Sequence, residues 1–138
     1  MKEIFTDFEI NEIIEDNKQL VAQRGDSFCV NNSDLSFIFT NVNNFDEITI
    51  FQDRIIRKAS WILGGISFYQ PFCDGNKEIA VSLTIFFLRE NDMDLPITDK
   101  QSQKELFDLL VKTIFKFEND PTIIPEIEQY VRQRVISI

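Results

Sequence analysis

The sequence predicts a single all-α domain over residues 1–138, with one buried helix at its centre. Apolar residues recur at three- and four-residue spacing along most of the chain, the pattern of helices that each bury one face. Glycine is rare, at four residues, so the chain offers few of the turns that a sheet needs. The length of 138 residues is that of one ordinary domain with one core.

The first two helices are predicted from capping residues and apolar stripes. Thr6 followed by Glu9 resembles a capping box, and the apolar positions behind it predict a helix over residues 7–23. Ser33 is expected to cap a short second helix rich in Leu, Ile and Phe. Residues 41–44, Asn-Val-Asn-Asn, are expected to form the loop that follows it.

The third and fourth helices contain the most apolar parts of the chain. Asn44 with Glu47 is expected to begin the third helix, whose apolar stripe includes the pair Gly64 and Gly65, where another backbone can approach closely. The fourth helix contains Ile79–Leu88 and is apolar on nearly every side. A helix of that kind is usually buried, so we expect it at the centre of the fold.

The last two helices are amphipathic. Thr98 with Gln101 is expected to open the fifth helix, and Asn-Asp-Pro at residues 119–121 is expected to stop it. A sixth helix then carries Arg132 and Arg134 near its end, where cations interact favourably with the helix dipole. We expect a short, slightly polar tail after it.

Charge and residue types argue against several classes of function. The formal net charge is −9, so we expect no nucleic-acid partner, because phosphate repels an acidic surface. The chain has no histidine, which removes the commonest general base and metal ligand. Cys29 and Cys73 are too few for a disulfide framework, so we expect a reduced pair in a cytoplasmic protein. The apolar runs are too short for a membrane span, so we expect no membrane association.

One stretch, QPFCDGNKE at residues 70–78, lies between the two most apolar helices. Gly75 permits a positive φ, Asp74 and Asn76 can bond backbone groups, and a helix is expected to begin beside them. The free N–H groups of a helix start, together with Lys77, form a site at which an anion can bind. The same residues also suit a turn that only caps the helix, and both interpretations stay open.

This stretch and the residues after it resemble the Fic/Doc family. The family motif reads His-Pro-Phe-x-Asp/Glu-Gly-Asn-Gly/Lys-Arg, and residues 70–78 read Gln-Pro-Phe-Cys-Asp-Gly-Asn-Lys-Glu. Residues 82–91, SLTIFFLREN, are similar to the family's central helix, and the acidic residues 45–48 look Doc-like. The resemblance covers most of the chain and is weakest over residues 1–32. It implies a Fic/Doc-like helical bundle.

The resemblance also implies a transferase site that uses a nucleoside triphosphate and Mg²⁺. Most Fic proteins transfer a nucleotide monophosphate to a protein hydroxyl, and Doc toxins phosphorylate elongation factor Tu. Carried over by position, Asp74 would hold Mg²⁺, which prefers oxygen ligands. Gly75 and Asn76 would cradle phosphate, and Lys77 would face it as a point charge.

Two positions depart from the family motif at its catalytic residues. Gln70 replaces the histidine that acts as general base, and an amide cannot accept a proton, a loss of roughly 10²–10⁴ in rate. Glu78 replaces the arginine that neutralises phosphate charge. Two unit charges about 4 Å apart interact by roughly 4 kcal/mol at an effective dielectric near 20, so the reversed sign is a severe change.

These departures lead us to interpret the chain as a degenerate Fic/Doc domain. It would be a pseudoenzyme that serves as a binding or regulatory protein related to toxin–antitoxin systems. Two alternatives stay open: an active Fic-type transferase with AMPylation-like or phosphorylating chemistry, and a scaffold or oligomerisation domain. Each alternative leads us to expect a protein partner or target, and each is compatible with a homo-oligomer.

Two further features of the family have weak counterparts. Thr122 and Glu126 have the spacing of the family's inhibitory helix but lack its final Gly or Asn, so we expect no self-inhibition. Residues 39–46 are our candidate for the flap that docks substrate, on position alone.

Overall fold

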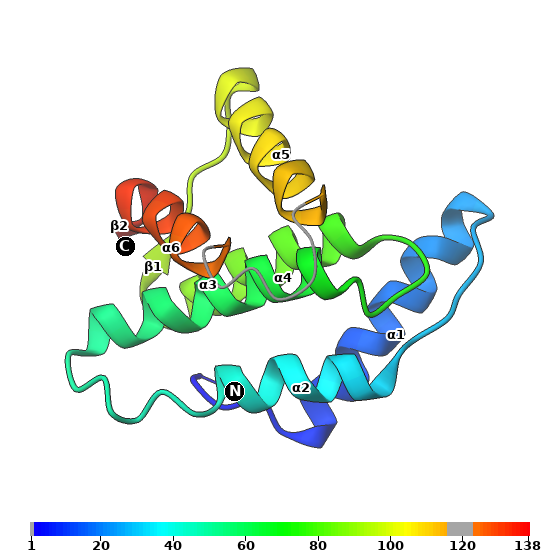
Figure 1. Ribbon diagram of the computed structural model, residues 1–138, viewed down its shortest axis with the longest axis horizontal. Helices are drawn as coiled ribbons and strands as arrows, with labels where there is room; N and C mark the ends of the chain where they lie inside the picture. Colours follow the sequence, from blue (N-terminus) through cyan, green and yellow to red (C-terminus); the bar gives the residue numbers. More distant parts are fainter. Residues whose placement is uncertain (1, 116–122) are drawn as a thin grey trace.

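The structure is a computed structural model that describes residues 2–115 and 123–138. These residues form six helices and one two-stranded sheet, which confirms the predicted all-α, single-domain fold (Figure 1). The elements in chain order are α1 (Asp7–Arg24), α2 (Asn32–Val42), α3 (Phe51–Tyr69), α4 (Asn76–Glu90), β1 (Met93–Asp94), α5 (Lys100–Phe115), α6 (Ile123–Arg134) and β2 (Ile136–Ser137).

Helix α3 lies at the centre of the fold. In Figure 1, α3 and α4 run side by side, with α1 and α2 on one side of the pair and α5 and α6 on the other. α3 contacts α2, α4, α5 and α6, and most of its second half is buried. Its glycine pair permits this crowding. A Cβ added at Gly64 would lie 2.9 Å from Cδ1 of Ile124 in α6, and one at Gly65 would lie 3.2 Å from Ile38 in α2.

The expectation that Ile79–Leu88 forms the buried central helix is therefore only partly correct. Phe87 is fully buried, but its neighbour Phe86 is 51% exposed. α4 buries one face against α3, and on its other side a groove separates part of it from α1. The second side of α4 carries the apolar residues that the sequence predicted, but no other element of the described chain fully covers them.

The first two helices begin with side-chain caps. Thr6 and Glu9 form the predicted capping box of α1, which ends within one residue of the predicted limit. The cap of α2 is Asn31 and not Ser33, because the Asn31 Oδ1 accepts the backbone N–H of Asp34 at 3.0 Å. Ser33 lies inside the first turn.

Two other predicted starts are displaced. The start of α3 is Phe51 and not Asn44, since the Asn44 side chain donates instead to a carbonyl in the last turn of α2. α5 begins after Asp99, whose Oδ1 accepts the N–H of Ser102, and not at Thr98. The predicted stop at residues 119–121 lies outside the described residues.

Both ends of the described chain are tied to the body of the fold. β2 pairs antiparallel with β1, so the expected polar tail is instead a short strand. Near the N-terminus, the Glu3 carboxylate accepts two hydrogen bonds from Arg54, at 2.6 and 3.1 Å. The buried Lys58 donates to the Glu3 carbonyl at 3.0 Å and lies 3.6 Å from its carboxylate. This cluster holds the N-terminal segment against α3.

Candidate functional site

The candidate site is the loop of residues 70–78, which joins the end of α3 to the start of α4. Gln70 caps α3 in the left-handed conformation, with φ 47°, and its backbone N–H donates to the Ile66 carbonyl. Its side chain is exposed. Gly75 has φ 77° and is the N-cap of α4. Left-handed residues therefore stand at both ends of the loop: Gln70 ends α3, and Gly75 precedes the first turn of α4.

Asn76 holds the loop together from within. Its Oδ1 accepts the backbone N–H of Phe72 at 3.0 Å, and its Nδ2 donates to the Phe72 carbonyl at 2.8 Å. Both residues are buried, and the two bonds use both polar atoms of the amide. The Asn76 side chain is therefore committed to backbone of its own loop.

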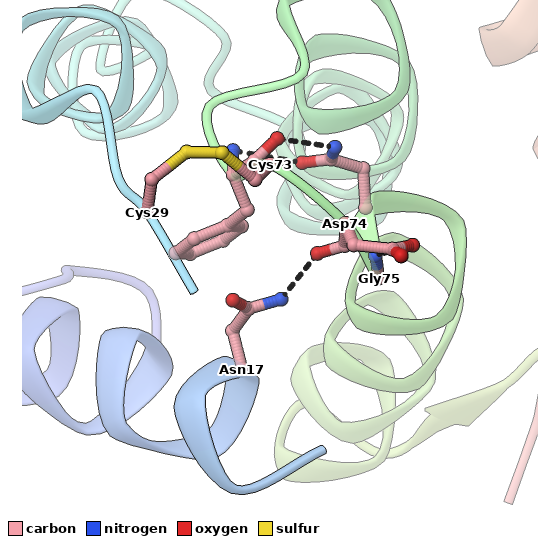
Figure 2. The surroundings of a disulfide bond; sticks show 7 residues. Asn17, Cys29, Cys73, Asp74 and Gly75 are labelled. Carbon is pink, nitrogen blue, oxygen red and sulfur yellow. Dashed lines mark hydrogen bonds between the residues drawn. A yellow bond between two sulfur atoms is a disulfide. The ribbon is translucent and has the colours of Figure 1, made fainter. Parts of the chain in front are cut away.

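Asp74 is also engaged within the chain. Its Oδ1 accepts the backbone N–H of Gly75 at 2.7 Å, so the amide that was expected to bind phosphate already has an acceptor. The Asp74 carbonyl accepts a hydrogen bond from the Asn17 side chain of α1 at 2.8 Å, and Figure 2 shows this amide reaching the loop. Asn17 is fully buried.

Close packing against α1 explains why position 75 is glycine. Besides the positive φ, an added Cβ would lie 2.9 Å from the Asn17 Nδ2 and 3.1 Å from the Leu20 Cδ2. Neither the conformation nor the space would accept another residue without a shift. The loop therefore rests on the second half of α1.

Glu78 has a partner that the sequence did not suggest. The Arg24 guanidinium, in the last turn of α1, lies 3.0 Å from the Glu78 carboxylate. Residue 78 is a glutamate where the family motif has an arginine, yet an arginine from α1, Arg24, lies beside that glutamate. Its position at the end of α1 could be predicted, but its approach to residue 78 depends on how α1 crosses α4.

The expectation of a reduced cysteine pair is wrong for this structure. Cys29, which lies between α1 and α2, forms a disulfide with Cys73 of the loop, and their Cα atoms are 5.1 Å apart (Figure 2). Val30 and Phe72 form an antiparallel bridge next to it, and the Cys73 N–H donates to the Cys29 carbonyl. Paired backbones bring the two thiols together, across 44 residues of chain.

The loop borders a hollow of about 280 Å³. It is lined by all six predicted site residues and by two more, Cys73 and Ile114 of α5: Gln70, Cys73, Asp74, Gly75, Asn76, Lys77, Glu78 and Ile114. The structure therefore brings the predicted residues together. The candidate flap, residues 39–46, does not border the hollow, because it leads to the start of α3 and the loop follows its end.

The charges around the hollow are mostly negative. Partial desolvation raises the pKa of Asp26, and the nearby Asp74 carboxylate raises it further, while Arg24 opposes the shift. Three carboxylates (Asp26, Asp74 and Glu78) thus gather near two cations, Arg24 and Lys77. This balance disfavours a polyanion.

The expected role of Asp74, to hold Mg²⁺ against a triphosphate, concerns a carboxylate that already has one partner in the loop. Its Oδ1 accepts the Gly75 N–H, and the Glu78 carboxylate lines the same hollow. Across residues 2–115 and 123–138, no group of three or more His, Cys, Asp or Glu side chains could hold a metal ion. Phosphates would have to supply the remaining ligands of a metal ion held by Asp74.

Comparison with family models, curated proteins and solved structures finds nothing that matches the chain. Within its described part, the longest apolar helices fall short of what a membrane crossing requires. Thr122 of the inhibitory spacing lies outside the described residues.

Proposed function

We propose that this chain is a non-catalytic relative of Fic/Doc proteins that acts as a binding or regulatory module. The resemblance of residues 70–78 motivates the choice of family, and the intramolecular partners of three polar side chains in the loop motivate the loss of chemistry. Asn76 bonds Phe72, the Asp74 carboxylate bonds Gly75, and Glu78 pairs with Arg24.

The observation that carries the proposal is that polar groups of the loop form hydrogen bonds with one another. A transferase of this kind needs free backbone donors and a cation aimed at phosphate, because its catalysis is mostly positioning and charge neutralisation. Here the Gly75 N–H has an intramolecular acceptor, and a carboxylate occupies position 78. The exposed Gln70 supplies no base.

Titration with ATP, with and without Mg²⁺, tests this proposal on four proteins: wild type, Glu78→Arg, Gln70→His and the double variant. We expect little binding to wild type or to Gln70→His, since a base acts on the target hydroxyl and not on phosphate. Glu78→Arg frees Arg24 and reverses one charge, so it should tighten binding by roughly tenfold at low salt. High salt should remove that gain.

Glu15→Arg is the matched control, because it makes the same charge change at an exposed position of α1 that does not line the hollow. If it tightens binding as much as Glu78→Arg, the effect is one of net charge alone. If Glu78→Arg leaves the affinity unchanged, the loop is only a capping turn and the functional interpretation of residues 70–78 is withdrawn.

Transfer of label from ATP to proteins of a lysate tests the active alternative. We expect no labelling by wild type. Labelling that Asp74→Ala abolishes would establish the transferase and overturn the non-catalytic proposal. The scaffold alternative has a separate readout, since its self-association would depend on protein concentration and not on nucleotide.

A further inference from the structure

A second concave surface lies between α1 and α4, and we refer to it as the α1–α4 groove. Its volume is about 390 Å³. α1 contributes residues at helical spacing i, i+3, i+4 and i+7, and α4 contributes a face with the same spacing. The lining residues are Phe5, Glu9, Glu12, Ile13, Asp16, Ile79, Ser82, Leu83 and Phe86.

Packed contacts close the groove at both ends. At one end Phe5 is buried between the rings of Phe39 and Phe87, with ring centroids 4.6 and 5.8 Å away. At the other end Asn17 and Leu20 of α1 pack against Gly75 at the start of α4. The groove between them spans two helical turns, about 10 Å at the α-helical rise.

The floor of the groove is apolar and incompletely covered. Ile13 and Ile79 form buried parts of it, while Leu83 is half-buried and Phe86 is 51% exposed. Concave surfaces lined largely by apolar side chains are common sites of ligand and partner binding.

The rim of the groove is acidic on its α1 side. Glu12 and Asp16 are exposed on the helix edge that borders it, and neither forms an ion pair within residues 2–115 and 123–138. Glu9, in the same row, belongs to the capping box. The α4 side carries Ser82 and no charge.

We propose that the α1–α4 groove binds an amphipathic helical segment of a partner protein, with apolar residues on one face and Lys or Arg beside them. The apolar face would cover Leu83 and Phe86, and the cations would pair with Glu12 and Asp16. A guest helix of two turns matches the length of the groove, and placing an amphipathic helix in an apolar groove is a common mode of peptide recognition. The inference stands apart from the loop of residues 70–78, because the groove shares no residue with the hollow beside it.

Fluorescence anisotropy of a labelled synthetic peptide tests the proposal. The probe is a short helical peptide of Ala, Leu and Lys, with Leu at i, i+3, i+4 and i+7 and Lys on both sides of that stripe. Its matched control has Glu at each Lys position. We expect the Lys peptide to bind wild type, the Glu peptide to bind at least about tenfold more weakly, and added salt to weaken the Lys peptide.

Variants of the protein locate the binding. Phe86→Glu and the double variant Glu12→Lys/Asp16→Lys should each weaken the Lys peptide by about tenfold or more. All three positions are exposed, so circular dichroism should show an intact fold. Glu15→Lys makes the same charge change on α1 outside the groove, and we expect less than about a twofold effect from it.

Three outcomes overturn the proposal. If Glu15→Lys weakens the peptide as much as Glu12→Lys/Asp16→Lys, or Phe86→Glu has no effect, the attraction is one of overall charge and the groove is not the site. The third outcome concerns α5, whose outer face carries Lys100, Lys104 and the exposed Phe107. If sedimentation shows self-association that Phe86→Glu and Phe107→Glu each abolish, the occupant is a second copy of this chain.

Discussion

Asparagine side chains hold the irregular segments of this protein in place. The Asn43 side chain bonds both backbone groups of Phe5, and Asn76 does the same for Phe72. Asn17 bonds the carbonyl of Asp74. An amide offers a donor and an acceptor at once, so it can replace the ladder partners that a loop lacks. These hydrogen bonds fix the conformation of the loop at residues 70–78.

Replacement of Asn76 tests this interpretation. Asn76→Ala leaves the buried N–H and carbonyl of Phe72 without partners, and we expect a loss of about 2–3 kcal/mol in the free energy of unfolding. The measurement is urea denaturation followed by circular dichroism. Lys77→Ala, the neighbouring position, should change stability by less than about 0.5 kcal/mol. Equal stability of Asn76→Ala and wild type would instead favour a role in ligand binding.

At the scale of elements, two adjacent residues of α4 lie in different environments, one buried and one exposed. Phe86 and Phe87 differ by 100° around the helix, so one lies in the groove and the other in the core. Phe87→Ala should cost about 3–5 kcal/mol, as a buried large-to-small change. Phe86→Ala should cost less than about 1 kcal/mol. Denaturation of the two variants side by side measures the difference, and similar losses would mean that the groove is closed in solution.

The disulfide joins two elements that are distant in sequence. Because it closes 44 residues of chain, its loss should lower the free energy of unfolding by about 2–4 kcal/mol. The double variant Cys29→Ser/Cys73→Ser and wild type treated with reductant should unfold alike in urea. Thiol alkylation and mass measurement report whether the bond was present. A wild type that carries two free thiols after purification under air would contradict the pairing.

At the scale of the whole molecule, the N-terminal segment depends on an ionised Glu3. The hydrogen bond from Arg54 lowers the pKa of this carboxyl below its usual value of 4.5, although burial opposes the shift. A lowered pKa means that the stability it contributes is present above pH 4.5 and is lost as the pH falls through the folded-state pKa. Burial lowers the pKa of Lys58, so that side chain depends on the same carboxylate.

Glu3→Gln should therefore cost about 1–2 kcal/mol at neutral pH, with a smaller difference from wild type as the pH falls below 4.5. Chemical denaturation at several pH values measures this difference. Glu15→Gln, at an exposed position of α1, should match wild type throughout. If Glu3→Gln loses the same free energy of unfolding in acid as at neutral pH, the charge of Glu3 does not contribute to stability.

The sequence predicted features that depend on residues close in the chain. The all-α class follows from apolar spacing, and the cap of α1 follows from Thr6 and Glu9. The turn at Gly75 and the helix start after it follow from local conformational preference. Caps were missed where several Asn, Asp and Ser residues compete nearby, as at Asn31 and Ser33, because all of them can accept the same backbone N–H.

What the tertiary structure alone decided is how distant segments meet. The bond between Cys29 and Cys73, the pair of Arg24 with Glu78 and the contact of Asn17 with the loop all depend on where α1 crosses α4. Helix periodicity states which residues share a face, but it does not state what covers that face. For this reason the apolar pattern of α4 was visible in the sequence, while its division into a buried face and an open groove was not.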